Sequence, residues 1–300
     1  MARITAYTEI ASSQGKTALE DADVLLLDGT NGSRKITAKE LANAMLDKSL
    51  KSAAAVGVGY GKSGIYRGAN LGSGATFAAA STADQRAAIA NGTFEGLFIG
   101  DYWTVNNILY RIADFNYWKR SGDTDFNTNH LVMIPESPSA LGTGKMNSTN
   151  ITTGAYVGSE MYADSSSVLN VARTKLSTDF GGYLASHKVY LPNAVSSNGA
   201  QSAGAWYEST AELMNELMVY GSWVYCKDNG GTYLYTVDKS QLAIFRLNPA
   251  MINPSRVGYW LRDVVSAANF ACVVHVGAAL NGIASGSLGV RPVFPVKGTA

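Results

Sequence analysis

The chain has 300 residues, a formal net charge of +1, 46% apolar residues and only 16% charged residues. This length accommodates one large domain with a small one, or two modest domains. The near-neutral charge and the lack of a basic run argue against a nucleic-acid partner and against attachment to an anionic membrane. No stretch reaches the ~20 apolar residues that span a bilayer, and the N-terminus lacks the apolar segment of a secretory signal. We therefore expect no membrane insertion. The two cysteines fit synthesis in a reducing cytoplasm.

Residues 1–50 are expected to form a small module for attachment or oligomerisation. Val24–Leu27 and Arg34–Thr37 predict two strands around the turn-forming run 28–32. Thr37 lies three residues before Glu40, which is the spacing of a capping box, and an apolar helix face follows as far as Leu50. A unit of this size has little core of its own, so we expect it to dock on another protein.

Residues 51–93 are expected to form a Gly/Ala-rich connector, because few of their side chains could fill a core. A short helix is predicted over 82–90, capped by Ser81 or Thr82 and ended by Asn91-Gly92. The run Gly57 to Ser63 resembles a phosphate-binding loop, but the first glycine of that motif would fall on Val56. A glycine-rich connector explains the run better.

Residues 94–300 predict a mixed domain, which makes the fold class α+β. A hairpin is expected with strands at 101–105 and 108–112 around Asn106-Asn107. Helices are predicted at 164–180 and 209–219. Further strands are expected at 130–134, 223–226, 232–237, 259–261, 271–276 and 290–296, with a tight turn at 228–231.

No catalytic or metal-binding constellation is evident, so we expect no enzyme, no catalytic residue, no metal and no cofactor. His130, His187 and His275 stand alone, without a second ligand at metal-binding spacing, and no Gly-x-Ser-x-Gly turn is present. Glu208 and Glu212 are typical of a solvated helix start rather than of a glycosidase pair. The aromatic residues between positions 102 and 118 favour core packing over sugar stacking.

Six short runs in the C-terminal two-thirds carry a resemblance. They are Asp101-Tyr102-Trp103, Tyr156 to Met161, Gly204-Ala205-Trp206, Glu212-Leu213-Met214, Tyr259 to Arg262 and Gly289 to Pro292. The series resembles phage and prophage proteins of gut bacteria whose C-terminal domain has a C-type-lectin-like fold related to the formylglycine-generating enzymes. Residues 1–50 resemble the attachment segments that open phage fibre and tail proteins.

The resemblance implies a virion protein, made in the bacterial cytoplasm, that binds a bacterial cell-surface receptor, either protein or glycan. The N-terminal module would attach it to other virion proteins, and a homotrimer would raise its affinity through multivalency. Leu191-Pro192-Asn193 is not accompanied by Trp-Asn-Asp, so a calcium-dependent sugar site is not supported. A catalytic pair of Cys226 and Cys272 is disfavoured, because Cys272 falls in the segment that would vary.

In the relatives, the region between Trp260 and Pro292 carries the receptor-binding surface, and some members are diversified by a retroelement that mutates adenines. Mutated AAC codons do not encode Gln, Glu, Lys, Met or Trp, and none of these five occurs in residues 264–288, here called the display segment. A buried, charge-poor pair of strands would lack the same residues. Both interpretations stay open on the sequence alone.

Trp260, Arg262 and Arg291 would be frame residues that hold the ends of the display segment, while side chains between them vary without unfolding it. The expected ligand-binding residues are Asn269, Val274, His275, Val276, Ala278, Leu280, Asn281, Ile283, Gly286 and Leu288. Two alternatives remain: a structural or decoration protein of the phage head or tail, and a glycan-acting enzyme.

Overall fold

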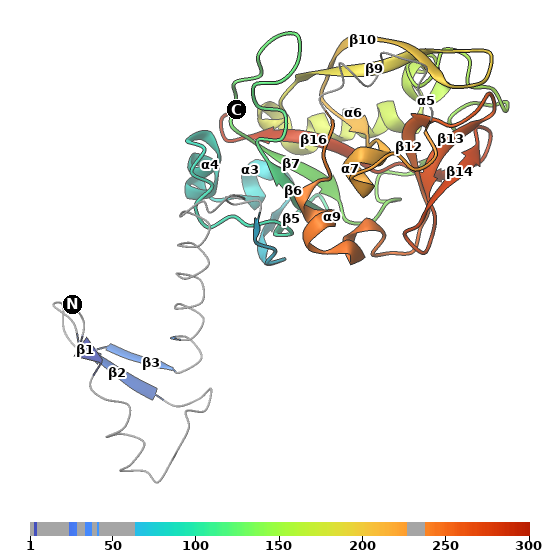
Figure 1. Cartoon of the computed structure of the whole chain (residues 1–300). Coiled ribbons are helices and arrows are strands. Elements are labelled where there is room, and N and C mark those ends of the chain that lie inside the picture. The colour runs from blue at the N-terminus through green and yellow to red at the C-terminus, as the bar shows by residue number, and fades with distance from the viewer. Residues whose placement is uncertain (1–2, 5–23, 29–33, 38–40, 42–63, 227–237) are drawn as a thin grey trace. The chain divides into compact units, whose positions relative to one another are not determined.

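The computed structural model describes residues 3–4, 24–28, 34–37, 41, 64–226 and 238–300. The chain divides into two compact units, residues 1–61 and 62–300. Strands predominate and helices are short, so the predicted α+β class is confirmed (Figure 1). In the first unit, β1 (Arg3–Ile4), β2 (Val24–Asp28) and β3 (Arg34–Thr37) form an antiparallel sheet in that order. The predicted hairpin is therefore confirmed, with Val24 opposite Thr37. The helix predicted after Thr37 lies outside the described residues, except for Leu41.

The second unit contains a six-stranded sheet in the order β11-β16-β7-β6-β5-β4. Asn106 and Asn107 both have positive φ (48° and 64°), the geometry of the tight turn expected between β5 and β6. The strand predicted at 130–134 is also confirmed, as β7. The strands are β4 (Asn70–Gly74), β5 (Tyr102–Val105), β6 (Ile108–Phe115), β7 (His130–Pro135), β11 (Glu212–Leu213) and β16 (Pro292–Lys297).

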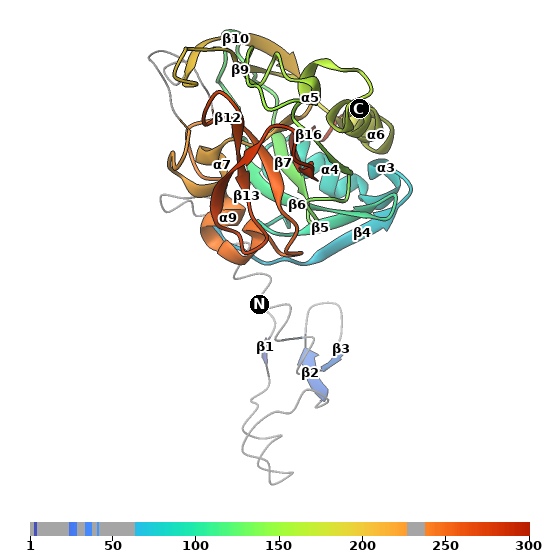
Figure 2. The same ribbon diagram turned by 90° about the vertical axis from the view of Figure 1, so that its right-hand side faces the viewer.

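A five-stranded sheet has the order β14-β13-β12-β15-β8, so that β14 is an edge strand. Figure 2 looks onto the side of the second unit where β12 and β13 lie, and a separate hairpin of β9 and β10 runs above them. The strands are β8 (Thr143–Gly144), β9 (His187–Val195), β10 (Gln201–Ser209), β12 (Tyr259–Val264), β13 (Asn269–Val273), β14 (Ala279–Ile283) and β15 (Leu288–Gly289).

Two apolar cores hold this unit together. The larger gathers side chains of the six-stranded sheet, of several helices and of β12 and β13, and it contains Trp103, Tyr110 and Trp118, as expected for these aromatic residues. The smaller gathers Tyr156, Leu169, Phe270 and other side chains around Trp260. The helical elements are α3 (Phe77–Ala80), α4 (Ala83–Ala90), α5 (Glu160–Ala163), α6 (Val168–Phe180), α7 (Glu216–Tyr220), α9 (Ala243–Leu247) and the 3-10 turns η2 (Gly181–Tyr183) and η3 (Pro249–Ile252).

The described part of the predicted connector, 64–93, is not a connector but part of the second unit. β4 pairs in parallel with β5, and Phe77 of α3 is fully buried. The lack of large side chains misled the prediction, because small residues allow backbone to approach backbone. A Cβ on Gly74 would lie 2.7 Å from the backbone N of Ala80. The short helix over 82–90 is confirmed as α4, with the complete capping box of Thr82 and Gln85.

Three other expectations are wrong in part. The helix predicted at 164–180 begins at Val168 and not at Asp164. The region 209–219 is not one helix: Glu212–Leu213 pairs with β16, and α7 starts only after its cap Asn215. Residues 223–226 form no strand, because the backbone N–H groups of 224–226 donate to the Glu216 carboxylate. The predicted turn at 228–231 and strand at 232–237 lie outside the described residues.

Candidate binding surface

The three expected frame residues are buried at the two ends of the display segment. Trp260 Nε1 donates to the carbonyl of Gly144 at 2.8 Å. Arg262 donates to the carbonyl of Leu213 and forms an ion pair with buried Asp238. Since these two side chains bond to different elements, the backbone that leads into residues 264–288 is fixed in place.

Arg291 is held by carbonyl groups and aromatic rings rather than by an acid. Its Nε donates to the Pro135 carbonyl at 2.9 Å and its Nη1 to the Ile252 carbonyl at 2.8 Å. The guanidinium lies over the rings of Tyr259 and Phe245, 5.3 and 5.6 Å from their centroids. Burial lowers the pKa of Arg291 from its ordinary value, while Tyr259 opposes that effect.

Beneath the display segment, Trp260 sets the path of β14. A Cβ on Gly282 would lie 2.8 Å from the far edge of the Trp260 ring. Glycine at this position therefore lets β14 pass directly over a buried indole. The neighbouring strand β13 is buried from Phe270 to Val273 and contributes to both cores.

None of the ten expected ligand-binding residues is buried. Val274, His275, Val276 and Ala278 lie in or beside the turn that joins β13 to β14, while Leu280, Asn281 and Ile283 lie on β14 itself. Val276, Leu280 and Ile283 are 61%, 43% and 51% exposed, which is high for such large apolar side chains. Gly286 follows in the loop after β14, where its N–H donates to the carbonyl of Ile283.

The fold brings most of these positions together. Asn269 opposes Ile283 across the β13–β14 ladder, and Asn269 Nδ2 donates to Oδ1 of Asn281 at 2.8 Å. Leu288 lies apart, since β15 is separated from β14 by β13 and β12. Its side chain is partly buried against the smaller core. The fold thus joins nine positions on the hairpin and its loop and places the tenth elsewhere.

A supporting loop at 147–152 was not anticipated from the sequence. The N–H of Asn147 donates to the carbonyl of Ala284, and Asn150 Oδ1 accepts from the N–H of Ser285. Thr152 bonds through its hydroxyl and its N–H to the carbonyls of Ser266 and Ala267. Ile151, between these anchors, is 50% exposed. Asn and Thr in a loop are too common to have marked these contacts in advance.

The display segment contains no Asp, Glu, Lys or Arg. The charges nearest along the chain, Arg262 and Asp263, are buried. Burial, followed by the proximity of Glu216, raises the pKa of Asp263 to about 8. The surface therefore offers apolar contact and amide hydrogen bonds rather than a charge pattern.

Among the other residues that the sequence singled out for possible chemistry, His130, His187 and Cys272 are buried. His130 and His187 are buried beside Trp118, and burial lowers the pKa of each to about 4. Cys272 is a buried free thiol, so it forms no disulfide with Cys226. Within the described residues, no group of three or more His, Cys, Asp or Glu side chains could hold a metal ion. No helix in the same part of the chain combines the length and apolarity needed to cross a bilayer.

Comparison with family models, curated proteins and solved structures finds no match to this chain.

Proposed function

We propose that this chain is a non-enzymatic receptor-binding protein of a phage virion, which recognises the bacterial host through the display segment. In this proposal the second unit is a C-type-lectin-like domain and the first unit attaches it to other virion proteins. The observation that carries the proposal is the exposure of large apolar side chains on an edge hairpin whose ends are held by buried residues. Exposed apolar clusters of this kind commonly mark interaction sites.

Burial explains only in part why Gln, Glu, Lys, Met and Trp are absent from the display segment. Strand β13 is buried, and burial there disfavours Gln, Glu and Lys without any mutator. From Val274 to Leu288, however, Ala284 is the single buried residue. The absence of all five types from this exposed stretch supports diversification by an adenine-mutating retroelement.

A homotrimer belongs to the same proposal. The contact side chains are uncharged and include no Trp, Tyr or Arg, the residues that most often anchor an interface, so one copy offers few strong anchors for a receptor. Three linked copies engaging one cell surface would raise the affinity without any new contact.

The test is binding of the full-length protein to whole cells of a panel of gut bacterial strains. Leu280→Lys combined with Ile283→Lys places two charges on the hairpin, and we expect cell binding to fall at least about tenfold. A control with the same added charge is Val171→Lys combined with Val224→Lys, since Val171 and Val224 are 55% and 50% exposed outside the display segment.

Cell binding that the hairpin variant retains in full would contradict the proposal, as would equal loss in the control variant. Exchange of residues 264–288 should abolish binding, whereas changes in residues 1–50 should leave it intact. A second candidate, a structural or decoration protein, is favoured by the open edge of β14, which could pack on a neighbouring subunit. It predicts that the hairpin variant fails to assemble into virions and that the protein alone does not bind cells.

A further inference from the structure

A polar pocket lies away from the display segment, where α5 and α6 meet the ends of β9 and β10. It has a volume of about 240 Å³ and is lined by Tyr162, Arg173, Ser186, Glu208, Ser209 and Thr210. This volume lies below the ~300–1,000 Å³ typical of pockets for drug-sized ligands. The pocket therefore suits one small ring.

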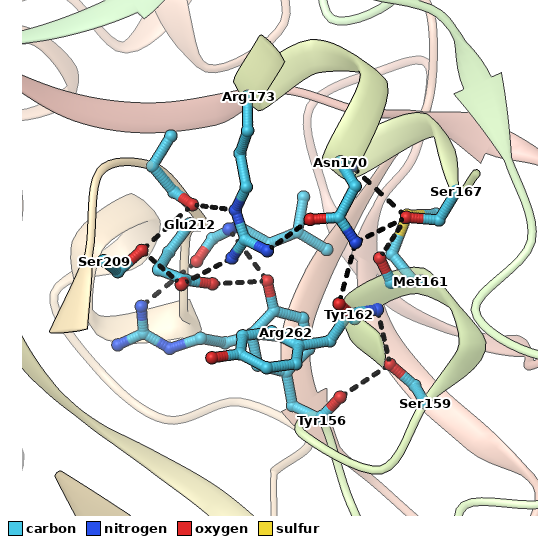
Figure 3. A network of polar contacts seen from close by, with 12 residues as sticks. Tyr156, Ser159, Met161, Tyr162, Ser167, Asn170, Arg173, Ser209, Glu212 and Arg262 are labelled. Atoms are coloured by element: carbon cyan, nitrogen blue, oxygen red, sulfur yellow. Dashed lines mark hydrogen bonds and ion pairs between the residues drawn. The ribbon is translucent and has the colours of Figure 1, made fainter. Parts of the chain in front are cut away.

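The wall of the pocket is fixed by a buried carboxylate. Glu212 is 2% exposed and accepts hydrogen bonds from Arg173 Nη2 at 2.6 Å, Ser209 Oγ at 2.5 Å and the Tyr156 hydroxyl at 2.7 Å. Figure 3 shows Arg173 extending from α6 between Glu212 and Asn170. A hydrogen-bonded network of this kind holds its members in one geometry before any ligand arrives.

The lining groups keep hydrogen-bonding capacity. Three of the five N–H groups of Arg173 donate to Glu212, Asn170 and the Ala211 carbonyl. The described residues supply no partner for the other two, nor for the hydroxyls of Tyr162 and Thr210. Burial raises the pKa of Tyr162 to about 12, so its hydroxyl remains a donor at neutral pH. Glu208 is 60% exposed and keeps acceptor positions beside Ser186, which donates to it.

The charges of the pocket compensate one another. Glu212 neutralises Arg173, and Lys188 Nζ lies 3.7 Å from the Glu208 carboxylate. An anionic ligand would meet Glu208 without a free cation, and a zwitterion would find Arg173 already paired. A neutral ligand with several hydroxyl groups matches the mixture of a carboxylate, hydroxyls and N–H donors.

The geometry points to a binding subsite at this pocket for one sugar ring of a neutral glycan. Glu208 accepts hydrogen bonds from ring hydroxyls, while Arg173, Tyr162 and Thr210 donate to ring oxygens. Because the pocket and the display segment share no residue, glycan binding at this subsite does not depend on the proposed function of the hairpin.

The experiment measures binding of the full-length protein to an array of neutral, sulfated and uronic-acid-containing oligosaccharides, and of free monosaccharides by saturation-transfer NMR. We expect neutral glycans to bind, and Glu208→Gln and Tyr162→Phe each to weaken that binding about tenfold. Glu208→Gln removes the charge and replaces one acceptor oxygen with an N–H donor, and Tyr162→Phe removes a hydroxyl donor. Glu95→Gln is the matched control, since Glu95 is exposed and does not line the pocket. If oligosaccharides bind but single sugars do not, the subsite recognises a sugar ring only as part of a longer glycan. If both bind, the subsite recognises the single ring on its own.

Four results would overturn the subsite: no glycan bound by folded protein, unchanged binding in both pocket variants, stronger binding of anionic glycans than of neutral ones, or glycan binding lost in the Leu280→Lys and Ile283→Lys variant but kept in Glu208→Gln. That last result would transfer glycan recognition to the display segment, so failure of the pocket and failure of the hairpin remain distinguishable.

Discussion

The close approach of Gly282 to Trp260 makes a quantitative prediction. In Gly282→Ala the added methyl group would lie 2.8 Å from two atoms of a fully buried ring. The ring cannot swing away freely, because Trp260 Nε1 is hydrogen-bonded to Gly144. Forced overpacking of this kind costs about 1–3 kcal/mol. We therefore expect the free energy of unfolding to fall by about 2 kcal/mol in a denaturant titration.

A double-mutant cycle separates this clash from a general effect of alanine in β14. Trp260→Phe removes the ring atoms that the methyl group would meet. The loss of unfolding free energy in the double variant should therefore be about 1–2 kcal/mol smaller than the sum of the losses in the two single variants. Ser287→Ala, at an exposed position of the same segment, should change stability by less than about 0.5 kcal/mol. Unchanged stability in Gly282→Ala, or strict additivity in the cycle, would refute the assignment of Trp260 as the floor beneath β14.

Two further predictions concern buried charge. His130 and His187, with pKa values lowered to about 4, bind protons more readily when unfolded, whereas Asp263, raised to about 8, binds its proton more readily when folded. Each contributes a slope of about 1.4 kcal/mol per pH unit, so stability should rise from pH 4 to about 6.5 and fall from there to pH 8. Denaturant midpoints across this range test it, and a fall above pH 6.5 that persists in Asp263→Asn would contradict it. Arg262→Ala should cost about 3–5 kcal/mol, because buried Asp238 loses its ion-pair partner, whereas Lys188→Ala, in a partly exposed pair, should cost at most about 1 kcal/mol. Similar melting temperatures for the two variants would count against this reasoning.

The sequence predicted the structure correctly where residues only a few positions apart determine the local geometry. Asn106-Asn107 suits the positive φ of a tight hairpin turn, and Thr82 with Gln85 forms a complete capping box. In both cases the residues that specify the geometry lie within a few positions of one another.

Tertiary pairing overrode local pattern elsewhere. Leu213 and Leu217 have helical spacing, but Leu213 pairs with Pro292 of β16, and a new helix begins after Asn215. The β9–β10 hairpin was missed altogether, because Gly204, Ala205 and Trp206 show no clean alternation of apolar and polar residues. Pairing between distant strands cannot be read from a window of ten residues.

The candidate surface was partly foreseeable. Large residues at the segment ends, Trp260, Arg262 and Arg291, predicted buried anchors, and all three are buried. The separation of Leu288 from the hairpin could not be predicted, because it follows from the strand order and not from sequence distance. The pocket beside Arg173 was invisible for the same reason: its lining comes from two parts of the chain that only the fold brings together.

Almost no side chain from Val274 to Leu288 is buried, so this stretch should tolerate many amino-acid substitutions. Exposed substitutions usually alter stability by less than about 0.5 kcal/mol, so many can accumulate before a protein falls below its stability threshold. With the anchors, Gly282 and Ala284 held constant, randomising the exposed hairpin positions should yield a library whose members mostly still fold. The second unit is thus a scaffold from which new binding proteins could be selected.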